Sequence, residues 1–121
     1  MNLFIEYPKC STCQKAKKWL LEHNIEYTDR NIITQTPTKD ELKKWVELYH
    51  FPVRKLFNTS GLKYRELNLK EKQKDMSEDA ILALLTTDGM LIKRPLLVTP
   101  NNILIGFKEQ EWETYFKEER K

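Results

Sequence analysis

The stretch IEYPKCSTCQKAKKWL, residues 5–20, joins the end of an apolar run to the start of a helical pattern and holds both cysteines of the chain, Cys10 and Cys13. Residues 3–5 form a short apolar run that is typical of a buried strand. From Ser11 onward, apolar side chains recur at helical spacing with lysines between them. The cysteine pair is therefore predicted to lie where a strand ends and a helix begins.

The rest of the chain extends this start into a recognisable order of elements. Residues 25–33 predict a second strand, and strand, helix and strand together predict a parallel βαβ unit with a right-handed crossover. Residues 96–98 and 103–105 surround a turn and predict an antiparallel hairpin, which a helix over residues 109–117 follows. The helical patterns between the two halves occupy about residues 36–90. The order predicts an α/β, thioredoxin-like fold (βαβ…ββα) with a helical insertion.

The insertion carries clear helix signals. Thr38 and Glu41 have the spacing of a capping box, and a helix is expected to follow them. A second helical pattern covers residues 67–76, and a third helix is predicted over residues 77–85. The sequence contains no linker-like or repeated segment. We therefore expect one domain over residues 1–121.

Composition narrows the class of protein. The chain has 121 residues, of which 40% are hydrophobic and 32% are charged, so it can bury a core and is too apolar for a disordered chain. A net charge of +3 does not single out nucleic acid as a partner. The apolar run near the N-terminus, residues 3–5, is too short to be the core of a signal peptide. The longest aliphatic run, residues 80–85, is too short to span a bilayer. We expect a cytoplasmic protein with no membrane partner.

The chemistry of the cysteine pair follows from its expected position. Unpaired N–H groups and the positive end of the helix dipole would point at the Cys10 sulfur and favour its thiolate, as would the charge of Lys9. Cys13 would be more enclosed and well placed to attack a Cys10 adduct. In the cytoplasm a structural disulfide is disfavoured. We therefore predict Cys10 as the nucleophile and Cys13 as the resolving thiol.

Two other interpretations of the pair stay open. A zinc site needs two further ligands, but His23 and His50, the only histidines, fit no common finger spacing. Two inert, packed cysteines are the remaining alternative. We favour redox or nucleophilic use and expect no bound metal.

Arg94 and Pro95 precede the predicted third strand and provide a second candidate site feature. In a thioredoxin-like fold the proline that enters this strand is usually cis and faces the first cysteine. A trans proline at the start of an edge strand is the commoner case in general. Within this topology we expect a cis bond at Pro95.

Five stretches together resemble the arsenate reductase-related (ArsC/Spx/MgsR) family, nearly from end to end. The family is identified from YPKCSTCQKAKKWL, PTKDELKKW, VRKLFNTSGLKYRELNL, DGMLIKRPLLVTP and ILIGFKEQEW. The chain looks closest to the arsenate reductase-like members. The resemblance implies the same thioredoxin-like core with a helical insertion.

The resemblance also implies roles for particular residues. Cys10 matches the cysteine that attacks arsenate in glutathione- or glutaredoxin-linked reductases, and Arg94 and Arg54 match arginines that bind the oxyanion. Guanidinium groups suit tetrahedral oxyanions because they bind them bidentately. We assign substrate binding to Arg54, Ser11, Thr12 and Pro95. No organic cofactor is expected to be bound, and the electrons would come from glutathione, glutaredoxin or thioredoxin.

Two departures from the reductases point toward other branches of the family. Gly106 and Phe107 stand where those reductases carry a further arginine, and Cys13 is a cysteine that they typically lack. Our first hypothesis is a monomeric thiol oxidoreductase. It would reduce arsenate or a disulfide and have a thiol redox protein as its partner. The second is an Spx-like redox-sensing regulator that binds the α-subunit of RNA polymerase without direct nucleic-acid contact. The third is a member that has kept the thiol pair and lost the chemistry.

Overall fold

The computed structural model describes residues 1–119. Contacts within the chain group it into two compact units: unit 1 comprises Met1–Arg30 and the chain from Arg94 onward, and unit 2 comprises Asn31–Lys93. The predicted insertion of residues 36–90 falls within unit 2. The last two residues of the predicted domain lie outside the described residues.

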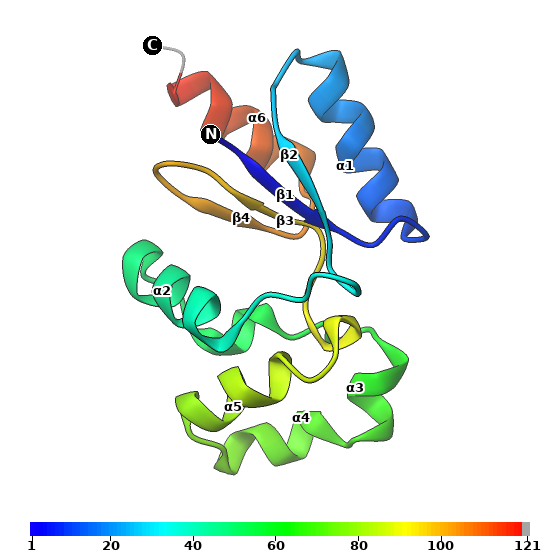
Figure 1. Cartoon of the computed structure of the whole chain (residues 1–121), viewed down its shortest axis with the longest axis vertical. Helices are drawn as coiled ribbons and strands as arrows, with labels where there is room; N and C mark the ends of the chain where they lie inside the picture. Colours follow the sequence, from blue (N-terminus) through cyan, green and yellow to red (C-terminus); the bar gives the residue numbers. More distant parts are fainter. Residues whose placement is uncertain (120–121) are drawn as a thin grey trace. The chain divides into compact units, whose positions relative to one another are not determined.

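Unit 1 is built on a sheet of four strands in the order β2-β1-β3-β4 (Figure 1). β3 pairs antiparallel with both β1 and β4, and β2 runs beside β1 in the same direction (Figure 1). The strands are β1 (Leu3–Glu6), β2 (Thr28–Asn31), β3 (Leu96–Val98) and β4 (Ile103–Ile105). The predicted βαβ…ββα order of an α/β fold is confirmed.

Strand register places the core of unit 1 on one face of the sheet. Phe4 pairs with Leu97, and Leu97 pairs with Leu104, so the three side chains share a face. Helices α1 (Ser11–Glu22) and α6 (Glu109–Glu119) supply the apolar side chains that pack against them, among them Ala16, Trp19, Leu20 and Trp112. Burying a side chain such as Leu20 or Phe4 stabilises the fold by about 1.5–3 kcal/mol.

The second strand is shorter than the sequence predicts. Residues 25–33 were expected to form it, but β2 covers only Thr28–Asn31. Ile25 donates its N–H to the Leu20 carbonyl at 3.0 Å and thus belongs to the helix exit. Asn31 Oδ1 accepts the N–H of Ile33 at 2.8 Å, and this local side-chain bond turns the backbone out of the strand.

Unit 2 consists of helices and 3-10 turns joined by short loops. α2 packs against α5, and Lys39 pairs with Asp79 at 2.7 Å between them. Phe57, near the middle of the unit, and Ile92, near its end, form an isolated antiparallel bridge. The helices are α2 (Lys39–Tyr49), α3 (Leu62–Glu66), α4 (Leu69–Lys72) and α5 (Glu78–Leu85), with 3-10 turns η1 (Val53–Leu56), η2 (Gln73–Asp75) and η3 (Gly89–Leu91).

The helical pattern predicted over residues 67–76 holds α4 followed directly by η2, which together cover residues 69–75. Asn68 adopts a left-handed conformation, with φ of 52°, and separates α3 from α4. Asparagine is one of the few residues that tolerate this conformation, because its short polar side chain bonds locally. Elsewhere in unit 2 the predicted capping box is confirmed, as is the start of α5 at Ser77.

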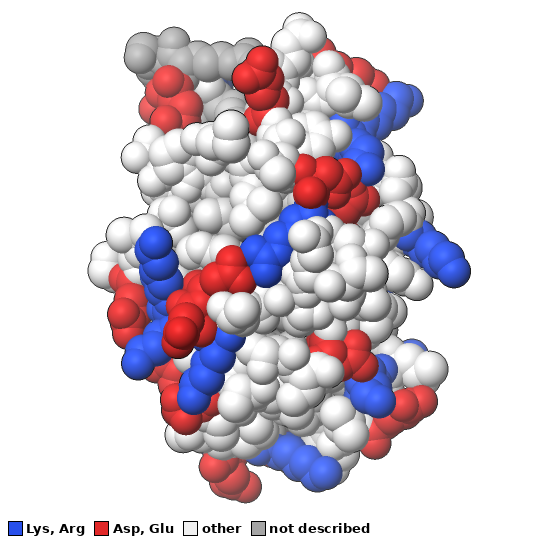
Figure 2. All heavy atoms as spheres, viewed as in Figure 1, with Lys and Arg blue, Asp and Glu red and all other residues white. Residues whose placement is uncertain are grey.

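The surface carries charges of both signs, interspersed over the face that Figure 2 shows. This mixture fits the small net charge and favours ordinary solvation over a single-sign binding patch. Among residues 1–119, no helix has both the length and the apolarity that a membrane crossing requires.

Candidate active site

Cys10 occupies the N-cap position of α1, as the sequence predicts. Its N–H donates to the Tyr7 carbonyl at 2.9 Å, and its own carbonyl accepts the N–H of Gln14 at 3.1 Å. The Gln14 amide then donates to the Pro8 carbonyl at 2.6 Å, which ties the loop to the first turn of the helix. The loop is therefore held at both ends, with the Cys10 side chain half-buried at the helix start.

The surroundings of Cys10 stabilise its thiolate. Burial raises the pKa of this thiol. The N–H and thiol groups of Cys13 donate to its sulfur and lower the pKa, and the Arg94 charge lowers it as well. The N–H of Thr12 adds a further hydrogen bond, and the net result is a pKa below the usual value. Lys9 was expected to help stabilise the thiolate, but its side chain is exposed. The positive charge that lowers the pKa of Cys10 is that of Arg94.

Cys13 lies in the opposite environment, one turn further along the helix. Its side chain is fully buried, and burial raises its pKa to about 12. The N–H of Tyr7 lowers the value in part, whereas the hydrogen bond to Cys10 and the Cys10 charge raise it. At neutral pH the pair therefore holds one thiol that ionises readily and one that keeps its proton. No disulfide joins Cys10 and Cys13 in this structure.

Arg94 stands over the Tyr7 ring, with its guanidinium carbon 5.3 Å from the ring centroid. This is within the range of a cation–π contact, which fixes the plane of the guanidinium. Its Nε and Nη1 atoms are buried and meet no hydrogen-bond acceptor within residues 1–119. The arginine thus presents buried donors beside the loop that holds Cys10, which suits an anion.

The structure also locates the other residues that we assigned to this site in unit 1. The peptide bond between Arg94 and Pro95 is cis, as predicted, and Pro95 is buried at the entry to β3. The side chains of Ser11 and Thr12 are exposed on the first turn of α1. Of these two residues, Thr12 contributes a backbone N–H to the Cys10 sulfur.

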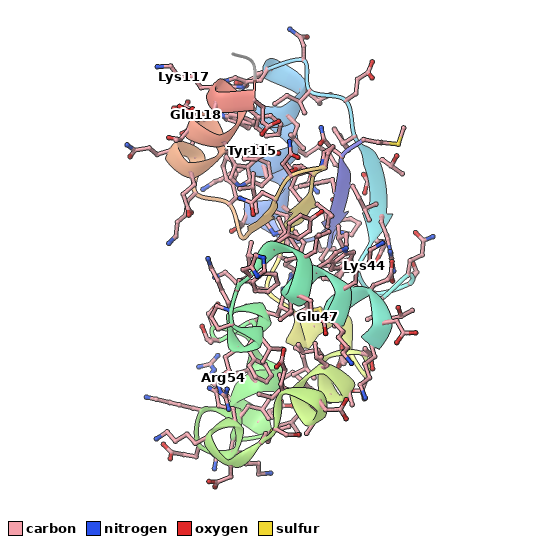
Figure 3. All side chains as sticks on the ribbon, turned by 90° about the vertical axis from the view of Figure 1, so that its left-hand side faces the viewer. Lys44, Glu47, Arg54, Tyr115, Lys117 and Glu118 are labelled. Carbon is pink, nitrogen blue, oxygen red and sulfur yellow. The ribbon has the colours of Figure 1, made fainter. Side chains whose placement is uncertain are left out.

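Arg54 belongs to unit 2, where Figure 3 labels it among the helical segments. Its Nη2 donates to the carbonyls of Gln73 at 2.8 Å and Met76 at 3.2 Å. These bonds satisfy carbonyl groups at the end of η2. Its assigned role in substrate binding stays a prediction.

A charged cluster that the sequence did not predict lies next to the cysteine loop. Glu6, the last residue of β1, is 1% exposed, and its Oε2 lies 2.7 Å from Lys17 Nζ. The same ammonium lies 3.0 Å from Asp29 Oδ2. A signal was available, because Glu6 ends an apolar strand at the alternation position of Phe4. No group of three or more His, Cys, Asp and Glu side chains in the described chain is arranged to hold a metal ion.

Curated relatives agree with the resemblance found in the sequence. An uncharacterized protein of Bacillus subtilis (strain 168), YusI, is 56% identical over 110 residues, which cover 91% of this chain and 93% of that protein. The regulatory protein MgsR of the same strain is 33% identical over 108 residues, covering 89% and 84%.

Solved structures and the family profile lead to the same result. An ArsC family related protein from Bacteroides fragilis superposes with a TM-score of 0.89 at 57% identity, over 93% of this chain and 95% of that one. A possible arsenate reductase from Streptococcus mutans gives 0.84 at 41%, over 93% and 98%. The sequence profile of the ArsC family matches residues 5–115. The chain belongs to the ArsC family.

Proposed function

We propose that the protein is a cytosolic thiol-dependent oxidoreductase in which Cys10 attacks the substrate and Cys13 resolves the product. The observation that carries the proposal is the contrast within the first turn of α1. The pKa of Cys10 is lowered by donors from Cys13 and by Arg94 in spite of its burial, whereas burial raises the pKa of Cys13 to about 12. An ionised nucleophile beside a protonated partner is the arrangement that thiol–disulfide exchange uses.

The cycle with a mixed disulfide balances without a further oxidant. The Cys10 thiolate attacks one sulfur of the substrate, the substrate S–S bond breaks, and the first thiolate leaves with the electron pair. Cys13 then loses its proton and attacks Cys10, which forms the internal disulfide and releases the second thiolate. Glutathione, glutaredoxin or thioredoxin would reduce that disulfide and return both thiols.

Arsenate is the second candidate substrate, and Arg94 supports it. Its buried Nε and Nη1 groups, beside the Tyr7 ring, suit a tetrahedral oxyanion. Cys10 would replace one arsenate oxygen, which leaves as water, and attack by Cys13 would then break the S–As bond. The electron pair of that bond would pass to arsenic, giving arsenite and the Cys10–Cys13 disulfide. The similarity to a possible arsenate reductase from Streptococcus mutans points in the same direction.

A regulatory role is the alternative function. It rests on the similarity to MgsR, a regulatory protein, at 33% identity. Here the same oxidation of Cys10 and Cys13 would serve as a switch for contact with the RNA polymerase α-subunit. A pull-down with the C-terminal domain of that subunit, using reduced and oxidised protein, tests this function. No binding in either state would remove it.

Turnover of defined substrates tests the proposed enzyme. Purified protein would be supplied with arsenate or with the mixed disulfide of glutathione and 2-mercaptoethanol, together with glutathione, glutaredoxin or thioredoxin. We expect turnover of at least one substrate that disappears in Cys10→Ser and persists in Lys108→Gln, an exposed change elsewhere in unit 1. Turnover that survives Cys10→Ser would reject the mechanism.

A further inference from the structure

Glu6 is a buried titratable side chain that the proposed cycle does not use. Carboxyl groups are rarely buried this completely unless they are paired, because removing their charge from water is costly. Its partner Lys17 reaches it from α1, and Asp29 reaches the same ammonium from β2. Lys17 alone would neutralise Glu6, so the additional contact with Asp29 suggests a role beyond pairing the buried charge.

Strand alternation puts Glu6 in the same buried layer as Cys13. Phe4 and Glu6 are two residues apart on β1, so both point to the face that α1 covers. Lys17 stands one turn beyond Cys13 on the same side of α1. The residue after Glu6 is Tyr7, whose N–H donates to the Cys13 sulfur. Tyr7 therefore links Glu6 to Cys13 through the backbone, and Lys17 reaches the Glu6 carboxyl from the side of α1 that carries Cys13.

The side chains of the cluster become more exposed from Glu6 to Lys17 to Asp29. The Asp29 side chain is 44% exposed, compared with 28% for Lys17 and 1% for Glu6. Burial raises the pKa of Glu6 to about 7, assisted by its hydrogen bond to Asp29 and opposed by Lys17. The pKa of Asp29 stays below its usual value, because hydrogen bonds from Glu6 and Lys17 outweigh its burial. A proton on Glu6 is therefore shared with a carboxylate that contacts water.

We propose that Glu6 accepts the proton of Cys13 in the resolving step, and that Asp29 and Lys17 connect it to solvent. The inference rests on the proposed function. In the step, the Cys13 thiol gives its proton through one water to the Glu6 carboxylate, and the Cys13 sulfur attacks Cys10. The bond between Cys10 and the departing thiolate breaks, the thiolate leaves with the electron pair, and the disulfide forms.

The resolving step needs such an acceptor because Cys13 is a poor acid. With its pKa raised by burial to about 12, the thiol holds its proton at neutral pH, and only the thiolate attacks a disulfide. A base that titrates near the working pH is the efficient partner for that proton. Of the titratable groups that act on the Cys13 thiol, Cys10 is bound in the adduct and Arg94 carries a fixed positive charge, so neither can take the proton.

A single-turnover reaction with 5,5′-dithiobis(2-nitrobenzoate) separates the two steps. Attack by Cys10 releases one coloured thiolate, and attack by Cys13 on the resulting adduct releases the second, so stopped-flow absorbance resolves both phases. In the unaltered protein we expect the second phase to accelerate with rising pH, to pass an inflection near pH 7 and to level off. A second phase without an inflection would overturn the role of Glu6, whatever a variant does.

Glu6→Gln removes the acid–base group at nearly constant shape. We expect an unchanged first phase and a second phase slower by on the order of 100-fold, with no inflection and a rate that follows hydroxide. Glu6→Asp, which keeps a carboxyl, restores the inflection at a lower rate. Glu22→Gln, an exposed change on α1, behaves as the unaltered protein.

The outcomes separate the two proposals. A normal second phase in Glu6→Gln rejects the proton acceptor and leaves the Cys10 and Cys13 cycle intact. A first phase that does not depend on Cys10 rejects the proposed function and the Glu6 step with it. Circular dichroism of the variants, with the first-phase rate, shows whether the loop that holds Cys10 is preserved.

Discussion

Helices α1 and α2 begin in opposite ways. At the start of α2, Thr38 Oγ1 accepts the Glu41 N–H at 3.1 Å, and Glu41 Oε1 accepts the Thr38 N–H at 2.9 Å. Asp40 and Glu41 add negative charge to the same turn. At the start of α1, Cys10 forms no side-chain cap of that kind, and the first turn holds no acidic residue.

The difference shows what each helix start contributes. At the start of α2, Thr38 caps the Glu41 N–H and acidic side chains face the positive end of the helix dipole, so this turn adds stability to unit 2. The N–H groups of Thr12 and Cys13 in α1 are directed at the Cys10 sulfur, which they stabilise most when it is ionised. The first turn of α1 is therefore arranged for a reactive anion, and that of α2 for folding.

Cys10→Ser should separate reactivity from stability at this position. Serine is a preferred N-cap residue, so we expect the free energy of unfolding not to fall. The hydroxyl is not ionised at neutral pH, so reaction with the aromatic disulfide should slow by at least ~10³-fold. Urea unfolding and stopped-flow absorbance measure the two effects. A serine variant that unfolds more easily would break the comparison between the two helix starts.

Cys13→Ser is the matched change on the buried thiol. We expect the first coloured thiolate to appear and the second to be missing, because no resolving sulfur remains. The adduct on Cys10 should then persist and be visible as added mass in an intact-protein spectrum. Release of two equivalents by this variant would show that another thiol source resolves the adduct.

Arg94→Gln tests the charge that acts on the first turn of α1. Without the guanidinium the pKa of Cys10 should rise, so alkylation by iodoacetamide at mildly acidic pH should slow several-fold. Lys108→Gln removes the same charge at an exposed position and should leave the rate unchanged. The rate of alkylation as a function of pH gives the pKa in each protein. Equal profiles would mean that the donors of the first turn of α1, including the Cys13 thiol, stabilise the thiolate without Arg94.

Local signals in the sequence were enough to predict both helix starts. The spacing of Thr38 and Glu41 specifies a capping box within four residues, and the structure contains it. The apolar run before Cys10 and the helical spacing after Ser11 likewise placed the cysteine pair at a strand–helix junction. These features depend on residues that are neighbours in sequence, so no tertiary contact is needed to recognise them.

Three features of the structure were not predicted. Asn68 adopts a left-handed conformation just before α4, and periodicity does not report a single residue's backbone conformation. The grouping of Glu6, Lys17 and Asp29 joins β1, α1 and β2, and its members are ordinary surface residue types in the sequence. Cation–π contact between Tyr7 and Arg94 spans most of the chain length. Sequence spacing carries little information about such pairs.

Thr38→Ala completes the comparison from the side of α2 and has the smallest expected effect. Loss of the hydroxyl leaves the Glu41 N–H without its cap, which should lower the free energy of unfolding by ~1 kcal/mol. Thr34→Ala, an exposed change ahead of the helix, should be nearly neutral. Both thiol phases should keep their rates, because the two cysteines belong to unit 1 and Thr38 belongs to unit 2. A Thr38→Ala protein as stable as its Thr34→Ala control would mean that the cap adds nothing, and that the two helix starts do not differ in what they contribute to folding.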